Sequence, residues 1–237
     1  ADYEKTAQQV GDVIWDMARA EDIYVTQYSQ DPMRKGVGVG EVHQLQRNRY
    51  IRVNFSMGDT AGHIHYGAAA RAVHAVDRQL ERLIPLLLSQ GWKVILTADH
   101  RQADLMSENG KTRHAHAPGR VRHAYIDPEN ENVKLHQEGM GLVNMARTVA
   151  EAAGIATVPD DWEWEPSIFA EKLKPRKPEE SEKVIEIILD GWGWNEDENI
   201  GEGVDAVRDH APFFQSLLKK YPWTPAEASG EAVGLRK

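Results

Sequence analysis

Aspartates and histidines that could hold divalent metal ions follow three apolar segments of the chain, each at the point where the segment ends. Asp59 and His63 follow the first segment, Asp99 and His100 the second, and Asp190 the third. Carboxylate oxygens favour Mg²⁺, whereas imidazole nitrogens add a preference for ions such as Mn²⁺ and Zn²⁺. Asp59 and His63 are four residues apart, which puts both on one face of a helical turn. The pattern predicts a divalent-metal site.

A further source of imidazole is the segment 107–118, where His114 and His116 flank Ala115. A lone aspartate after a strand is more often a turn or helix cap than a ligand, and a lone histidine is more often a packing or surface residue. Repetition of the pattern after three segments favours a metal site over those alternatives. We expect His74 and His210 to be structural, and no spacing supports a role for the remaining histidines, which are His43, His65, His123 and His136.

The apolar segments have the length and composition of buried strands, and they span 50–55, 92–98 and 184–189. Between the first two, apolar residues recur at helical spacing over 66–90, where Pro85 should kink the helix or end its regular hydrogen bonding. Strand, helix and strand form a βαβ unit, so the two strands should be parallel with a right-handed crossover. Ligands bind at the carboxyl ends of parallel strands, and the acids and histidines should therefore gather at one sheet edge.

Other segments complete the expected organisation. Apolar periodicity predicts helices over 6–20, within 139–154 and over 203–221. Residues 27–49 are polar, Gly-rich and basic, and we interpret them as a loop or an ordered insertion. Residues 171–183 are rich in Lys, Glu and Pro, which predicts an exposed, flexible linker. The predicted fold class is α/β, with a mostly parallel sheet and helices on both faces.

The composition excludes several classes of protein. The 237 residues include no cysteine, which excludes disulfides, zinc–thiolate sites and cysteine nucleophiles. Hydrophobic residues make up 41%, enough for a sizeable core. The formal net charge of −9 argues against a nucleic-acid or anionic-membrane partner. The densest apolar run, 83–88, is too short to span a bilayer, and the polar N-terminal residues do not resemble a signal peptide, so we expect a cytoplasmic protein.

Six segments of the chain match motifs of one known family. They are NFSMGDTAGH at 54–63, AVD at 75–77, TADH at 97–100, HAH at 114–116, DGWG at 190–193, and YP followed by EASGEAVGL at 221–235. They resemble the motifs NFxNGDMVGH, EAVD, TADHG, HTAH, DGWG and YPxTLLEASGEAVGL of the cofactor-independent (2,3-bisphosphoglycerate-independent) phosphoglycerate mutases. The resemblance covers most of residues 50–237, and the motifs together are highly specific.

The resemblance implies an alkaline-phosphatase-like α/β core that holds two divalent metal ions. Mn²⁺ is the ion it favours, with Mg²⁺, Co²⁺ and Zn²⁺ as alternatives. The implied function is transfer of a phosphoryl group between the 2- and 3-positions of glycerate, a glycolytic isomerase reaction on a small phosphorylated substrate. The implied ligands are Asp59, His63 and His116 for one ion, and Asp99, His100 and Asp190 for the other.

The order of the motifs differs from the order in the family, where DGWG lies near the N-terminus. We therefore expect residues 1–237 to form a single phosphatase-like α/β domain in circularly permuted order. In it, 1–170 would be the family's C-terminal portion, 171–183 the linker and 184–237 the N-terminal portion. Domain termini often lie close together, which makes such a rearrangement tolerable.

Three departures from the family bear on activity. We expect no counterpart of the family's second domain, whose arginines hold the substrate, and Arg101 replaces the glycine of TADHG. The GNSEVGH motif, whose serine is the nucleophile, is echoed only by GVGEVH at 38–43, with Gly40 in place of the serine. Three functions stay open: a mutase with impaired turnover through a phosphoenzyme, a non-catalytic metal-binding domain, and a small phosphatase that uses activated water.

Overall fold

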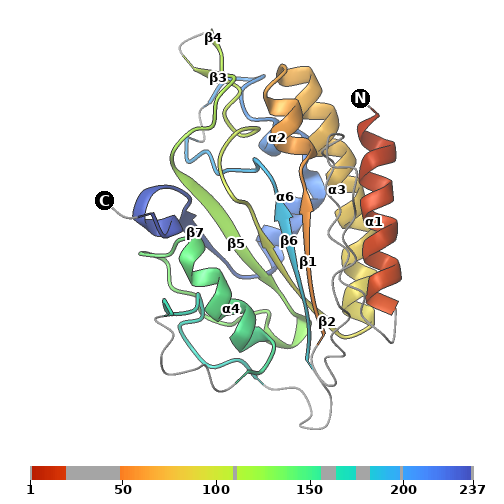
Figure 1. Cartoon of the computed structure of the whole chain (residues 1–237), viewed down its shortest axis with the longest axis vertical. Helices are drawn as coiled ribbons and strands as arrows, with labels where there is room; N and C mark the ends of the chain where they lie inside the picture. Colours follow the sequence, from red (N-terminus) through yellow and green to blue (C-terminus); the bar gives the residue numbers. More distant parts are fainter. Residues whose placement is uncertain are drawn as a thin grey trace.

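The computed structural model of the chain describes residues 2–19, 49–108, 111–155, 164–174, 182–197 and 200–235. This part is built on a five-stranded sheet with the strand order β1-β6-β2-β5-β7 (Figure 1). β6 pairs in parallel with β1 and β2, whereas β5 runs antiparallel to β2 and β7, so β5 alone of these strands points the other way. The mostly parallel sheet is confirmed. Its strands are β1 (Arg49–Phe55), β2 (Trp92–Thr97), β5 (Arg120–Ile126), β6 (Lys183–Leu189) and β7 (Trp223–Glu227).

The strand from late in the chain, β6, lies between the two strands of the predicted βαβ unit. Phe55 of β1 pairs with Leu189, and Thr97 of β2 pairs with Ile188. Every residue of β6 after Lys183 is buried, as expected for a central strand covered on both faces. The carboxyl ends of β1, β6 and β2 therefore meet at one edge of the sheet.

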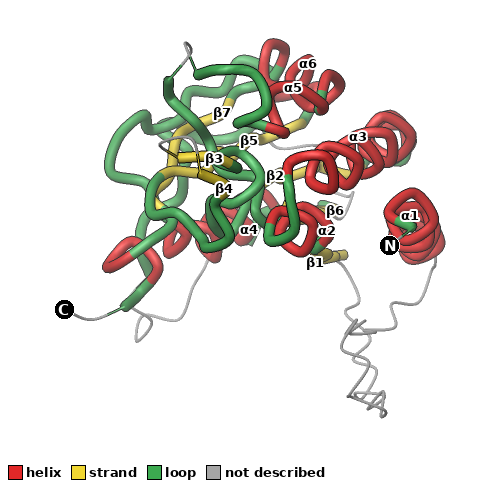
Figure 2. The backbone as a smooth tube through the Cα atoms, turned by 90° about the horizontal axis from the view of Figure 1, so that it is seen from above, coloured by secondary structure: helices red, strands yellow, loops and turns green. Residues whose placement is uncertain are grey.

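Helices cover both faces of the sheet, as predicted (Figures 1 and 2). Lys93 of β2 donates a hydrogen bond to the carbonyl of Ala152 at the end of α4, which fixes the face that α4 covers. The opposite face is covered by α1, α3, α5 and α6. The helices are α1 (Tyr3–Arg19), α3 (Tyr66–Ser89), α4 (Met145–Ala152), α5 (Ala206–His210) and α6 (Pro212–Lys220).

Helix α3 runs through Pro85 to Ser89, close to the predicted 66–90, so the proline does not end the helix, one of the two effects expected of it. Pro85 lies close to the C-terminal end, and its missing N–H removes only the hydrogen bond to the carbonyl of Glu81. On the same helix, buried Asp77 accepts hydrogen bonds from the backbone N–H groups of Phe213 (2.9 Å) and Phe214 (2.8 Å). Asp77 therefore ties α3 to the first turn of α6.

The single helix predicted over 203–221 is wrong, because the chain forms α5 and α6 with a break between them. Ala211 has φ −119° and ψ 62°, outside the helical region. The residue before a proline is disfavoured in the helical region, and Pro212 instead supplies a suitable first residue for α6. Within 139–154, the predicted helix is α4, preceded by a short 3-10 turn at Leu142–Asn144.

Two strands of the five-stranded sheet were not predicted. β5 carries Arg120, Arg122 and His123 among its apolar residues, and β7 contains Pro225, a residue that usually argues against a strand. The interpretation of residues 27–48, the echo at 38–43 and the middle of the proposed linker, 175–181, lie outside the described residues. No helix in the described ranges is long and apolar enough to cross a membrane.

Candidate metal centre

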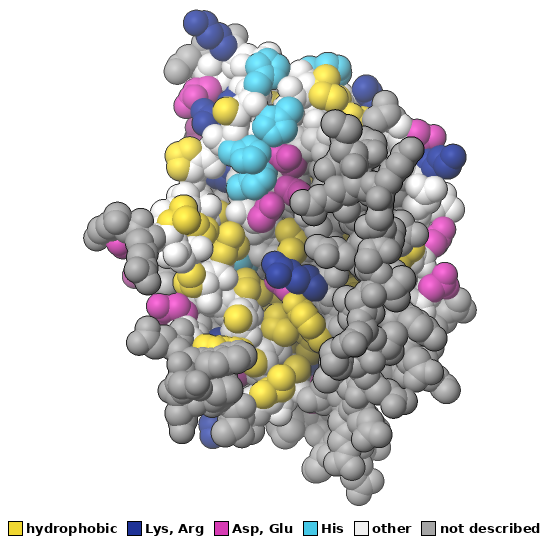
Figure 3. Space-filling model, in the orientation of Figure 1, with side chains coloured by type: hydrophobic (Ala, Val, Ile, Leu, Met, Phe, Trp, Pro, Cys, Tyr) yellow, Lys and Arg dark blue, Asp and Glu magenta, His cyan; other side chains and the backbone are white. Residues whose placement is uncertain are grey.

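The predicted ligands are brought together at the sheet edge where β1, β6 and β2 end. Figure 3 shows histidine side chains gathered over acidic ones at the upper end of the molecule in that view. Asp59 lies on the short helix α2 (Met57–Gly62), which follows β1 directly. In the described part of the chain, two groups of side chains have ligand atoms that all lie within 4.8 Å of one another: Asp59, His100 and His116, and Asp99, His100 and Asp190.

In the first group, a single carboxylate oxygen faces several imidazoles. Asp59 Oδ1 lies 3.0 Å from His116 Nε2 and 3.1 Å from His63 Nε2. His100 Nε2 lies 3.7 Å from the same oxygen. The Nε2 atoms of His63 and His116 are 3.2 Å apart. His63 therefore lies with Asp59 and His116, as the family resemblance implies.

The second group joins residues that follow β2 and β6. His100 Nε2 lies 3.3 Å from Asp190 Oδ1 and 3.7 Å from Asp99 Oδ2. The backbone N–H of Gly191 donates to Asp99 Oδ1 at 3.2 Å, which links the two ligand-bearing loops. The rings of His100 and His116 stack with centroids 3.7 Å apart. The two groups are therefore adjacent, and His100 faces both.

The protonation of these side chains reflects the crowding of carboxylates. Burial, followed by the charge of Asp190, raises the pKa of Asp99. Burial lowers the pKa of His100, but the hydrogen bond to Asp190 and the nearby acids outweigh it and raise the pKa to about 9. Burial raises the pKa of Asp190, yet hydrogen bonds from His100 and Asn54 lower it overall. The carboxylates thus attract positive charge, and this mixed O and N donor set fits a divalent ion.

Hydrogen bonds orient one imidazole for ligation. His63 Nδ1 lies 2.7 Å from the carbonyl oxygen of His114, and His114 Nδ1 lies 2.9 Å from that of His63. A carbonyl only accepts, so each Nδ1 donates its N–H, and Nε2 of His63, which faces Asp59 and His116, is the nitrogen that would bind an ion. His114, which spacing alone did not separate from His116, supports the site by accepting the hydrogen bond of His63 at its carbonyl.

Glycine at 191 allows the turn after β6 to pack against α2. Gly191 has φ +77°, and a Cβ there would lie 2.9 Å from both the N and Cα atoms of Asp59. Any side chain would therefore be strained in conformation and would collide with backbone. The absence of a side chain at Gly191 therefore lets the turn that follows Asp190 lie against Asp59.

Arg101 directs its charge to a buried acid. Its Nε lies 2.6 Å from Oδ2 of Asp104, a residue that is 1% exposed. The side chain packs closely against Gly119 and Gly193. A Cβ at either position would come within 3 Å of it. The cation that replaces the family's glycine is therefore held by Asp104 and braces the 99–104 loop.

Arg113 is a supporting residue that the sequence did not reveal. Its guanidinium donates to the carbonyls of Ala115 (3.1 Å) and His116 (3.0 Å) and to Glu108 Oε2 (2.6 Å). It joins the loop that carries His116 to the β3 (Ser107–Glu108) and β4 (Lys111–Thr112) hairpin. Only its position directly before the HAH segment could have drawn attention to it.

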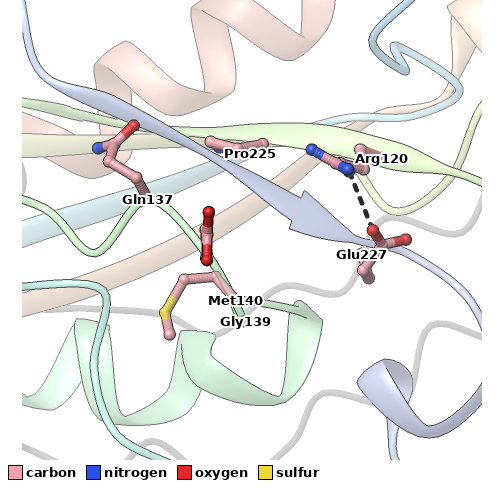
Figure 4. A pocket seen from close by; sticks show the side chains of 7 residues that line it. Arg120, Gln137, Gly139, Met140, Pro225 and Glu227 are labelled. Atoms are coloured by element: carbon pink, nitrogen blue, oxygen red, sulfur yellow. Dashed lines mark hydrogen bonds and ion pairs between the residues drawn. The ribbon is translucent and has the colours of Figure 1, made fainter.

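A separate pocket of about 370 Å³ lies beside β5 and β7 (Figure 4). Its one arginine is neutralised, because Arg120 Nε lies 3.0 Å from Glu227 and 3.4 Å from Glu196. None of the predicted ligands lines this pocket, so it is distinct from the metal centre. Its lining residues are Arg120, Gln137, Glu138, Gly139, Met140, Pro225 and Glu227.

Known proteins match the chain over about half of its length. The chain is 32% identical over 149 residues to the 2,3-bisphosphoglycerate-independent phosphoglycerate mutase of Synechococcus sp. (strain JA-2-3B'a(2-13)), covering 57% of this chain and 28% of that protein. Identity to the enzyme of the same name from Haloquadratum walsbyi is 31% over 137 residues, 55% of this chain and 27% of the relative. Identity to the enzyme of the same name from Hahella chejuensis is 37% over 86 residues, 35% of this chain and 17% of the relative.

The chain thus spans about a quarter of the length of the curated relatives that it matches. No solved structure matches it. The model of the metalloenzyme superfamily matches residues 20–157, a range that holds five of the six predicted ligands and leaves out Asp190. This match extends over more than half of the sequence, and the chain belongs to the metalloenzyme superfamily.

Proposed function

We propose that this chain holds two divalent metal ions, preferably Mn²⁺, and uses them for phosphoryl transfer on a small phosphorylated substrate. The proposal rests on one observation, the two adjacent groups of carboxylates and imidazoles at the end of the parallel strands. One ion would lie between Asp59, His63 and His116, and the other would be held by Asp99, His100 and Asp190. The relatives are named phosphoglycerate mutases, which favours phosphoglycerate as the substrate.

Side chains and backbone groups of the chain prepare this site in three ways. The carboxylates collect positive charge at the sheet edge, and the hydrogen bond from His63 to His114 keeps an imidazole nitrogen free for ligation. The Gly191 N–H fixes Asp99 beside the turn that carries Asp190. A pair of divalent ions, when bound, supplies charge that stabilises the attacking and leaving oxygens of an in-line displacement.

We also propose that the described segments before and after the linker form one domain in permuted order. The position of β6 between β1 and β2 supports a single domain, because neither part alone completes the sheet. The permuted order rests on the order of the motifs, with DGWG at 190–193 after TADH at 97–100. The hydrogen bonds that Asp77 accepts from the start of α6 support a single domain too, since they join residues 136 and 137 positions apart.

A turnover experiment tests the proposed function and separates the alternatives. We expect slow conversion of 3-phosphoglycerate in a coupled assay that requires Mn²⁺ and is abolished by Asp99→Ala. Hydrolysis of an aryl phosphate without mutase turnover would instead indicate a phosphatase. Mn²⁺ binding by calorimetry with neither activity would indicate a non-catalytic metal-binding domain, and absence of both binding and turnover would refute the proposal.

Replacing Arg113 with alanine is expected to weaken binding of the ion beside His116 by about tenfold, the lower end of the effect of removing a supporting residue. The carbonyls of Ala115 and His116 would lose their shared donor, so the loop would position His116 less accurately. The ion held by Asp99 and Asp190 should be unaffected.

Calorimetric titration with Mn²⁺ measures both affinities. Lys111→Ala is the control, because Lys111 is an exposed cation on the same hairpin. Equal affinities in the Arg113 and Lys111 variants would show that Arg113 does not position the site.

A further inference from the structure

The amide of Asn54 contacts a carboxylate of the second group from the neighbouring strand. Asn54 is the next-to-last residue of β1, and its side chain is exposed. Its Nδ2 donates a hydrogen bond of 2.9 Å to Oδ2 of Asp190. The parallel register makes this possible, because Asn54 pairs with Ile188, two residues before Asp190.

This hydrogen bond separates the roles of the two oxygens of Asp190. Oδ2 accepts from Asn54, whereas Oδ1 faces His100 Nε2 at 3.3 Å. A carboxylate that is held at one oxygen loses rotational freedom about its χ2 angle. Oδ1 is therefore kept in the direction of Asp99 and His100, where the second ion would lie.

An amide suits this position better than other side chains of its size. It donates without adding negative charge, whereas an aspartate would bring a further carboxylate next to Asp99 and Asp190. A leucine would fill the same space and leave Asp190 unrestrained. The exposed position means that Asn54 contributes little to the core, so its bond to Asp190 can be tested without unfolding the chain.

We propose that Asn54 is a positioning residue for Asp190 and sets the affinity of the ion held by Asp99, His100 and Asp190. This inference rests on the proposed function, since it assumes that the second group binds a divalent ion. Partners that hold ligating carboxylates are worth about 10- to 100-fold in metal affinity. The effect should be confined to one of the two ions.

The same strand offers a matched control. Arg52 lies two residues before Asn54 and therefore on the same face of β1, and it pairs in register with Glu186. Its Nε lies 3.3 Å from Glu186 Oε2, and the Tyr50 hydroxyl also bonds to that carboxylate. Arg52, like Asn54, makes a polar contact from β1 to β6, but its partner is not a ligand.

The test is calorimetric titration of the full chain, stripped of metal, with Mn²⁺ at pH 7.5, together with thermal unfolding without metal. We expect Asn54→Ala to lower the affinity for one ion by about tenfold or more and to leave the affinity for the other unchanged, with little change in Tm. Asn54→Gln, which keeps the amide, should recover part of the affinity. Arg52→Ala should lower Tm, because buried Glu186 loses its cation, and should leave both affinities unchanged.

Unchanged affinities in Asn54→Ala, alongside two sites in the unsubstituted chain, would overturn the inference and leave the proposed function intact. Equal effects of the Asn54 and Arg52 variants on affinity would also overturn it, because both would then act through strand pairing. An unsubstituted chain that binds no Mn²⁺ would overturn the proposed function and the inference together.

Discussion

Replacing Asp59 with asparagine is expected to reduce the affinity for Mn²⁺ by about 100-fold or more, beyond the range found when only a supporting residue is removed. Asp59 Oδ1 lies within 3.1 Å of the Nε2 atoms of His63 and His116. It supplies the carboxylate of the first group, and an amide of the same shape lacks its charge. Calorimetric titration with Mn²⁺ at pH 7.5 measures the loss, and circular dichroism checks that the fold is kept.

Asp12→Asn is the matched control for Asp59→Asn. Asp12 lies on α1 and pairs with Arg82 of α3 at 2.8 Å, far in the fold from the strand ends that carry the ligands. The same chemical change there should leave Mn²⁺ affinity as it is. Binding by Asp59→Asn within about threefold of the unsubstituted chain, less than one supporting residue contributes, would show that Asp59 is not a ligand.

The sequence predicts the place of the site because the ligands follow recognisable strands. Apolar runs of strand length are followed by Asp59, Asp99 and Asp190, and parallel strands bring their carboxyl ends together. The structure adds that β6 lies between β1 and β2, which no local pattern of the chain contains. That order follows from pairing between residues more than 80 positions apart.

The supporting residues could not be predicted because their roles depend on side-chain geometry. Asn54 is one residue of an NF motif, and its contact with Asp190 spans 136 positions. His114 and His116 are alike in sequence, yet one donates to a carbonyl and the other faces Asp59. The local sequence also gave a wrong prediction at Pro212. The helical spacing of apolar residues continues across it, but the helix is interrupted at Ala211.

Two buried groups away from the metal centre should give opposing pH dependences of stability. His123 on β5 is fully buried, with Nδ1 2.7 Å from Thr97 Oγ1, and burial lowers its pKa from 6.5 to about 4. Asp205 caps α5 through the N–H of Arg208, and burial, with the charge of Asp104, raises its pKa from 3.8 to about 7. Between pH 4 and 6.5 the unfolded chain binds more protons at His123, whereas the folded chain binds more at Asp205.

The signs of the two contributions follow from linkage. The free energy of unfolding contributed by His123 falls as the pH drops from 6.5 to 4, because the unfolded imidazole takes up a proton that the folded one refuses. The contribution of Asp205 rises over the same range, because the folded carboxyl keeps its proton. At about 1.4 kcal/mol per pKa unit, each amounts to about 3 kcal/mol, and the two should largely cancel.

Removing either group should therefore reveal the pH dependence of stability that the other contributes. With His123→Gln, stability relative to the unsubstituted chain should rise by about 3 kcal/mol from pH 7 to pH 4. With Asp205→Asn, which keeps the helix cap, it should fall by a similar amount over that range. Urea unfolding in EDTA at pH 7, 5.5 and 4 measures both, and differences between variants cancel the titration of the metal ligands, which all three proteins share. Parallel curves for all three proteins would mean that neither buried group keeps its altered protonation in solution.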